Sequence, residues 1–191
     1  QEFQLPATID PPHALHGFGL ISSWQEIGPG RSLLHLPAPY NGATVEQSIE
    51  VLDDAVRWSL EYEPNGCELP AWMGFHPWFA RDLDRGGSAE IEFGATEMLV
   101  RGSDGIPTGK RSAPTPQPWD DAFTGIKGTP AVVWEDVARI SIECDAPWWV
   151  VYTEDSEGVC LEPQTAPPDA QNLGISGENY IEALFVFESL E

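Results

Sequence analysis

Apolar and polar residues alternate along short segments of this chain. In residues 45–51 and 56–62 nearly every second residue is apolar, and Gln47 is the exception. Successive side chains of a β-strand point to opposite faces, so this spacing predicts two strands that each bury one face. We expect the two strands to be neighbours joined by a turn at Asp53-Asp54.

The same signal predicts further short strands, each followed by turn-forming residues. They span residues 89–93, 97–101, 131–134, 137–144, 148–153, 158–161 and 180–187. In residues 137–144 the alternation separates an apolar face from a polar one, which favours antiparallel pairing. No window keeps helical spacing for long, because 18 Gly and 18 Pro interrupt the chain. The pattern therefore predicts an all-β fold with little helix, either a sandwich or a barrel.

Two proline-rich stretches lack strand character. Residues 102–128 are expected to form a long ordered loop or lid, since strands continue on both sides. Residues 163–178 are expected to form a second loop. The length of 191 residues fits one domain covering residues 1–191.

The charge of the chain excludes some classes of partner, and its cysteines indicate its location. The chain has 31 Asp and Glu against 9 Lys and Arg, a formal net charge of −22. Such a field repels polyanions, so nucleic acid and anionic membranes are poor partners. No apolar run reaches the roughly 18–20 residues that a membrane span needs. Cys67, Cys144 and Cys160 are widely spaced, which is typical of reduced core thiols and indicates a cytoplasmic location.

Two histidines, His16 and His76, stand beside glycine and aromatic residues. A lone histidine in such a place is more often a hydrogen-bonded structural residue than a functional one. In the segment GFHPWF, residues 74–79, Pro77 fixes the backbone and Trp78 supplies a flat apolar surface. Such a loop can hold an imidazole beside a sugar ring. The alternative is an aromatic strand end packed in the core.

Two positions with carboxylate side chains are also candidates for a function. Glu162 follows the apolar strand 158–161 and precedes a proline-rich turn. Burial raises the pKa of a carboxyl group, and a partly desolvated glutamate can act as a base near neutral pH. Asp120 and Asp121 follow Trp119 and suit hydrogen bonds from sugar hydroxyls. The alternatives are a surface glutamate, a solvated Asp-Asp turn, or a glycosidase pair formed by Glu162 and Asp120.

Several familiar motifs are missing from the sequence. It contains no glycine-rich phosphate loop before a helix, no GxSxG and no HExxH. His13 and His16 stand far in sequence from other ligand types, so they do not indicate a metal site. We therefore expect no metal.

Four segments occur in order along nearly the whole chain. They are LHGFG at 15–19 with Trp24 downstream, GFHPWF at 74–79, PWDDAF at 118–123 and CLEPQTAPPDAQN at 160–172. Together they resemble the aldose 1-epimerase family, also called galactose mutarotases, and the last segment is the most specific. The resemblance implies a large antiparallel β-sandwich. It also implies an isomerase that interconverts the α and β anomers of a free hexose, such as glucose or galactose, without a cofactor.

The resemblance also implies roles for individual residues. Glu162 looks like the general base and His76 like the general acid of ring opening. The residues that the resemblance implies for sugar binding are His16, Asp120, Trp78 and Gln164. One base and one acid suffice, because opening a pyranose removes the anomeric hydroxyl proton and delivers a proton to the ring oxygen.

The chain departs from the family pattern at its start. Family members usually have a longer N-terminal portion with a sugar-contacting arginine, and neither Arg31 nor Arg57 stands in a context that replaces it. We therefore expect a sandwich that lacks its N-terminal strands. Gln171 and Leu20 also differ from the residues frequent in the family. These departures support a sugar-binding or regulatory module without turnover as an alternative.

A hexose-6-phosphate 1-epimerase is a further alternative within the family. It would gather basic residues around the phosphate, and a charge of −22 with only two lysines disfavours it. The expected partner is thus a small aldose, and the sequence makes no prediction of oligomeric state.

Overall fold

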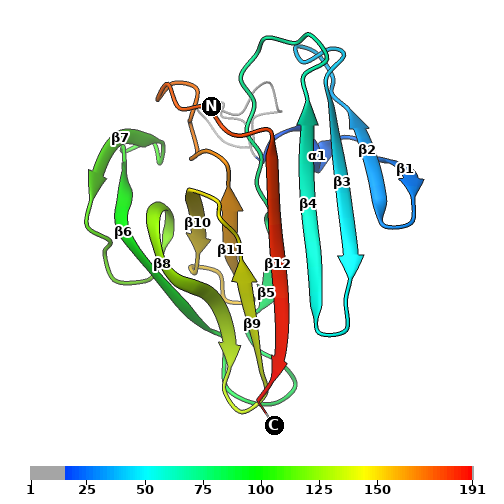
Figure 1. Cartoon of the computed structure of the whole chain (residues 1–191). Helices are drawn as coiled ribbons and strands as arrows, with labels where there is room; N and C mark the ends of the chain where they lie inside the picture. Colours follow the sequence, from blue (N-terminus) through cyan, green and yellow to red (C-terminus); the bar gives the residue numbers. More distant parts are fainter. Residues whose placement is uncertain (1–15, 191) are drawn as a thin grey trace.

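Residues 16–190 are described by the computed structural model, and their strands join in one bent antiparallel sheet (Figure 1). The elements are α1 (Phe18–Ile21), β1 (Gln25–Gly28), β2 (Arg31–His35), β3 (Thr44–Val51), β4 (Ala55–Glu63), β5 (Trp78–Ala80), β6 (Glu90–Arg101), β7 (Pro107–Ser112), β8 (Asp120–Trp134), β9 (Ala138–Glu143), β10 (Trp148–Tyr152), β11 (Gly158–Gln164) and β12 (Tyr180–Ser189). Among these residues no helix is long and apolar enough to cross a membrane. His13 and the expectations for residues 1–12 lie outside the described residues.

The path through the sheet is not the order of the chain. It runs β1-β2-β3-β4-β12-β9-β8-β10-β11-β5, while β6 pairs with both β8 and β7. Figure 1 shows how the sheet bends, so that β10, β11 and β5 are seen behind β9 and β12. The predicted all-β class with antiparallel pairing and little helix is confirmed, since the described part of the chain contains a single helix of four residues.

The first predicted hairpin is confirmed. β3 and β4 pair antiparallel with Val51 opposite Val56, and the turn lies at Asp53-Asp54. Burial varies along the hairpin, because Tyr62 at one end packs in the core, whereas Val51 at the other end is exposed although Ala55 beside it is buried. Alternation therefore predicted the pairing correctly, but the burial of each residue depends on which part of the hairpin is covered by the rest of the sheet.

The predicted loop at residues 102–128 is wrong. β7 and the first half of β8 lie within it, and the predicted strands 89–93 and 97–101 merge into the single strand β6. Glycine explains the error, because β8 continues through Gly125 and Gly128, which have φ angles of +67° and +68°. The register between β6 and β8 shifts near Gly128. A bulge of this kind bends a strand without ending it. The alternation pattern also missed β1, β2 and β5.

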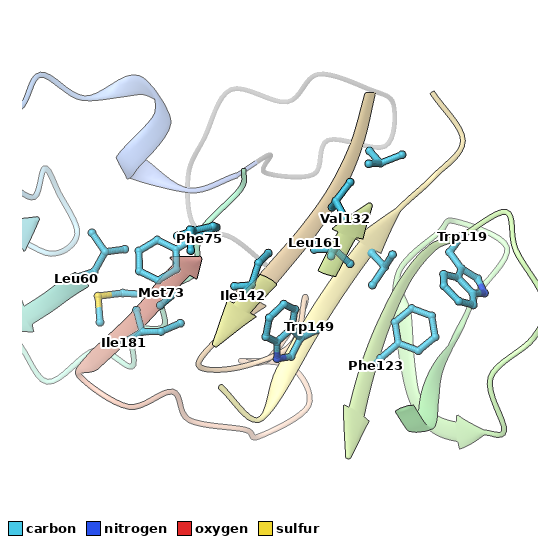
Figure 2. Packing of buried hydrophobic residues seen from close by; sticks show 14 of the residues in the cluster. Leu60, Met73, Phe75, Trp119, Phe123, Val132, Ile142, Trp149, Leu161 and Ile181 are labelled. Carbon is cyan, nitrogen blue, oxygen red and sulfur yellow. The ribbon is translucent and has the colours of Figure 1, made fainter. Parts of the chain in front are cut away.

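The core lies between the two sides of the bent sheet. Figure 2 shows Trp149 and Leu161 in the same cluster as Ile142 and Ile181, which come from other strands. Full burial of a large apolar side chain contributes about 1.5–3 kcal/mol. The cluster includes Phe75, which lies between β4 and β5 and is almost completely buried. The residue that follows Phe75 is therefore held by the core.

Candidate active site

The segment that carries His76 is paired with the end of β11. The Phe75 amide donates to the carbonyl of Pro163 at 3.1 Å, and the Thr165 amide donates to the carbonyl of Met73 at 2.8 Å. The Met73 amide in turn donates to Thr165 Oγ1 at 2.9 Å, and both residues are buried. These three bonds fix the chain just before His76 beside the end of β11, and just after His76 the pairing of Trp78 with Cys160 continues the contact.

Core and site side chains alternate along β11. Val159 and Leu161 belong to the hydrophobic core. Cys160 and Glu162 occupy the intervening positions, so their side chains point to the opposite face of the strand. Glu162 is only 6% exposed and is one of the few buried polar residues. The expectation of a partly desolvated glutamate at this position is met, although the residue lies inside the strand and not at its exit.

The central pair of the site is His76 and Glu162. His76 Nδ1 lies 3.5 Å from Glu162 Oε1. Nδ1 is buried and makes no hydrogen bond with the described residues, so the two groups are in ion-pair range without an aligned hydrogen bond. The side-chain amide of Gln164 donates through Nε2 to the other carboxylate oxygen of Glu162, Oε2, at 3.4 Å. A carboxylate and an imidazole in this arrangement can act as a base and an acid on one bound molecule.

A second imidazole, that of His16, lies against the first. The rings of His16 and His76 are 4.5 Å apart between centroids and meet edge to face at 84°. His16 has a left-handed backbone, with φ of 61°, and Gly17 continues the turn with φ of 74°. The Trp24 indole donates to the carbonyl of Gly19 at 3.0 Å, which holds this turn in place.

The pKa values of both imidazoles are lowered. Burial lowers the pKa of His16. Burial is also the main cause for the lowered pKa of His76, and the neighbouring charge of His16 adds to it. Since the ordinary histidine pKa is about 6.5, both rings are mostly neutral at pH 7.

An exposed aromatic surface adjoins the pair. The Trp78 indole is 55% exposed and stacks on His76, with 5.9 Å between centroids and 13° between planes. The Tyr152 ring meets the Trp78 ring edge to face, with 5.8 Å between centroids. Flat aromatic faces of this kind pack well against the apolar face of a ring-shaped ligand.

A pocket of about 220 Å³ opens beside these groups. Its polar side is formed by His16, His76, Glu162 and Gln164. The apolar remainder includes Phe18, Trp24, Leu34, Leu36, Tyr40, Val45, Leu60, Tyr62, Ala71, Trp72, Met73 and Phe75. The pocket is smaller than the roughly 300–1,000 Å³ of sites for drug-sized ligands and fits a small molecule. Sequence reasoning missed this apolar wall, because its residues carry no signal that separates them from ordinary core residues.

Asp120 lies apart from the other predicted site residues. It is absent from the pocket wall, and its carboxylate accepts a 2.7 Å hydrogen bond from Arg101. Asp120 stands opposite Tyr152, which stands opposite Cys160, so it shares a sheet face with Glu162. Strand spacings place the two Cα atoms about 12 Å apart. No local pattern connects Arg101 with Asp120, because their contact needs the pairing of β6 with β8.

Comparisons with known proteins support the fold. No family model and no curated protein matches the sequence. Among solved structures, a candidate aldose 1-epimerase of Escherichia coli K12 superposes with a TM-score of 0.79 at 20% identity, covering 98% of this chain and 76% of that one. A galactose mutarotase-like protein of Clostridium acetobutylicum gives 0.72 at 15% identity, covering 97% and 72%.

A third structure, the GalM/aldose epimerase homologue of C. elegans, gives a TM-score of 0.68 at 14% identity, covering 93% of this chain and 72% of that one. At these identities the likeness concerns the backbone. The chain therefore has the antiparallel β-sandwich fold of galactose mutarotase-like proteins, as its sequence motifs implied.

Proposed function

We propose that this protein is an aldose 1-epimerase that interconverts the α and β anomers of a free hexose such as glucose or galactose. The observation that carries the proposal is the approach of His76 Nδ1 to within 3.5 Å of Glu162 Oε1 at the wall of a small pocket. The names of the similar structures support the same reaction.

The reaction needs one proton removed and one delivered. The Glu162 carboxylate takes the proton of the anomeric hydroxyl, while His76, in the minority of molecules in which it is protonated at pH 7, gives one to the ring oxygen. The bond between the anomeric carbon and the ring oxygen breaks, and a free aldehyde forms. The aldehyde rotates about its first carbon–carbon bond. Ring closure then returns both protons, with the two residues exchanging roles, and gives the other anomer.

The remaining groups bind and orient the sugar. His16 lies against His76 and faces the same pocket, and Trp78 offers its exposed face beside the pair. Gln164 holds one oxygen of Glu162 and leaves the other directed at His76. Asp120 accepts hydrogen bonds from sugar hydroxyls further along the same face of the sheet.

The test is polarimetry of freshly dissolved α-D-glucose and α-D-galactose. The wild-type chain should accelerate the decay of rotation over buffer for at least one sugar. Glu162→Gln should lose the acceleration by about 100-fold or more, since a general base contributes typically 10²–10⁴. Glu157→Gln is the matched control, because Glu157 is an exposed glutamate just before the same strand. A folded Glu162→Gln variant with wild-type rate would overturn the assignment.

A sugar-binding module without turnover is the second candidate. The observation in its favour is the position of Asp120, which is held by Arg101 away from the pocket. Calorimetry would then give saturable sugar binding by a wild-type chain that leaves the rate of mutarotation unchanged. Any acceleration that depends on Glu162 excludes this candidate.

A further inference from the structure

The site contains a buried thiol that the epimerase reaction does not use. Cys160 is completely buried, two residues before Glu162 on the same face of β11. Ring opening and closure require only a carboxylate and an imidazole. The Cys160 thiol therefore has no role in the chemistry proposed above.

This thiol lies within reach of both catalytic groups. One ligand atom each from His76, Cys160 and Glu162 lies within 4.8 Å of the other two. Cys160 is paired with Trp78 across β11 and β5, which brings it next to the stacked ring of His76. The three residues come from two segments whose positions are fixed by backbone hydrogen bonds and by the core.

Thiolate, imidazole and carboxylate are the three ligand types that zinc takes from proteins. Zinc–ligand bonds of about 2.0–2.3 Å in a tetrahedron place neighbouring ligand atoms about 3.5 Å apart. The three groups can therefore close on one ion through small side-chain movements. A thiolate and a carboxylate together neutralise a divalent cation, which satisfies the need of buried charges for a partner.

We propose that His76, Cys160 and Glu162 form a binding site for Zn²⁺, with the fourth position open toward the pocket. On binding, the ion replaces the proton of the Cys160 thiol, and that proton passes to solvent. The bound ion occupies one nitrogen lone pair of His76 and one oxygen lone pair of Glu162, and so competes with their proton transfer. If the proposed function holds, zinc is therefore a reversible inhibitor of this protein.

The direct test uses the untagged chain and the metal alone. Co²⁺, a spectroscopic substitute for Zn²⁺, should give a thiolate-to-metal charge-transfer band that saturates at one equivalent. Zn²⁺ should abolish this band by displacing the cobalt. Cys160→Ala should lose the band and bind Zn²⁺ at least about tenfold more weakly by calorimetry. Cys144→Ala, which removes a partly buried cysteine outside the group, should behave as wild type.

A second variant keeps the test decisive if Cys160→Ala does not fold. Glu162→Gln should retain a thiolate–cobalt band but bind Zn²⁺ at least about tenfold more weakly, because one anionic ligand is lost. Absence of a band in the wild type overturns the proposal. So does wild-type zinc affinity in either variant.

The inhibitory consequence is measured separately, so that its failure is distinguishable from failure of the metal site. Micromolar Zn²⁺ should slow wild-type mutarotation, and a chelator should restore it. In Cys160→Ala the ratio of rates without and with zinc should fall toward one, whatever the starting rate of that variant. A chain that binds zinc by the spectroscopic criterion but does not accelerate mutarotation contradicts the proposed function and supports the metal site.

Discussion

The imidazole of His16 meets the ring of His76 edge to face, with 4.5 Å between their centroids. Two positive charges at this separation repel, so protonation of one ring disfavours protonation of the other. The lowered pKa of His76 follows first from burial and then from this neighbour. His16 thus affects the ionisation of the proposed acid as well as the shape of the pocket.

Replacing His16 by asparagine should raise the pKa of His76. The variant removes the repelling charge but leaves the burial that is the larger cause, so the pKa should rise while staying below the ordinary histidine value. Protonated His76 would then persist to higher pH, and the alkaline fall in mutarotation rate should move upward. A proton–nitrogen NMR titration of the imidazole measures this shift. His35→Asn, a change at an exposed histidine, is the control, and an unchanged pKa in His16→Asn would contradict the prediction.

Gly74→Ala should loosen the contact between the His76 segment and β11. A Cβ at Gly74 would lie 2.6 Å from Gln164 Cγ and 3.0 Å from the carbonyl oxygen of Pro163. Crowding of this kind costs about 1–3 kcal/mol of unfolding free energy. Urea denaturation gives the midpoint, and mutarotation should slow as Gln164 moves away from Glu162. Gly28→Ala is the matched control, since its Cβ meets nothing within 4 Å. Equal midpoints for the two variants would refute the argument.

Trp78→Ala should weaken sugar binding with little effect on stability. The indole is exposed, so its loss leaves the core intact. Loss of an aromatic contact costs about 0.5–1.5 kcal/mol, which corresponds to about a two- to thirteenfold rise in KM. Trp78→Phe keeps a flat ring and should recover part of the affinity. Steady-state polarimetry separates KM from kcat, and a KM equal to wild type in the alanine variant would exclude Trp78 from the binding surface.

Asp120 and Asp121 allow a paired test of sugar recognition. Arg101 contacts Asp120 Oδ2 at 2.7 Å and Asp121 Oδ1 at 3.1 Å, so either substitution by asparagine weakens one contact of the same guanidinium. Only Asp120 shares a sheet face with Glu162, because adjacent residues of a strand point to opposite faces. Asp120→Asn should therefore raise KM for the hexose, and Asp121→Asn should not. Similar KM values in the two variants would remove Asp120 from the substrate-binding residues.

Local patterns predicted the parts of the fold that obey them. The β3–β4 hairpin and the strand at residues 158–161 follow from residues close in sequence. β7 and the start of β8 could not be predicted in this way, because the glycines and prolines between residues 102 and 128 resemble those of a loop. Only the completed pairing with β6 shows that Gly125 and Gly128 lie inside a strand.

The candidate site, like the fold, could be predicted only in part from residues close in sequence. The family-like segments indicate Glu162 and His76 as site residues, whereas nothing in their spacing along the chain brings them together. Their approach depends on the hydrogen bonds between residues 73–75 and 163–165 and on the burial of Phe75. The contact of Arg101 with Asp120 and the place of Cys160 beside His76 were not predicted for the same reason, because each depends on the pairing of distant strands.

The alternation along β11 also limits how this protein can change over generations. Inserting or deleting one residue between Gly158 and Leu161 would exchange the two faces, turning Leu161 toward the pocket and Glu162 toward the core. Such a descendant would lose its fold and its chemistry together. Point substitutions on one face are the gradual route left open, so new activities on this strand should arise without any change in its length.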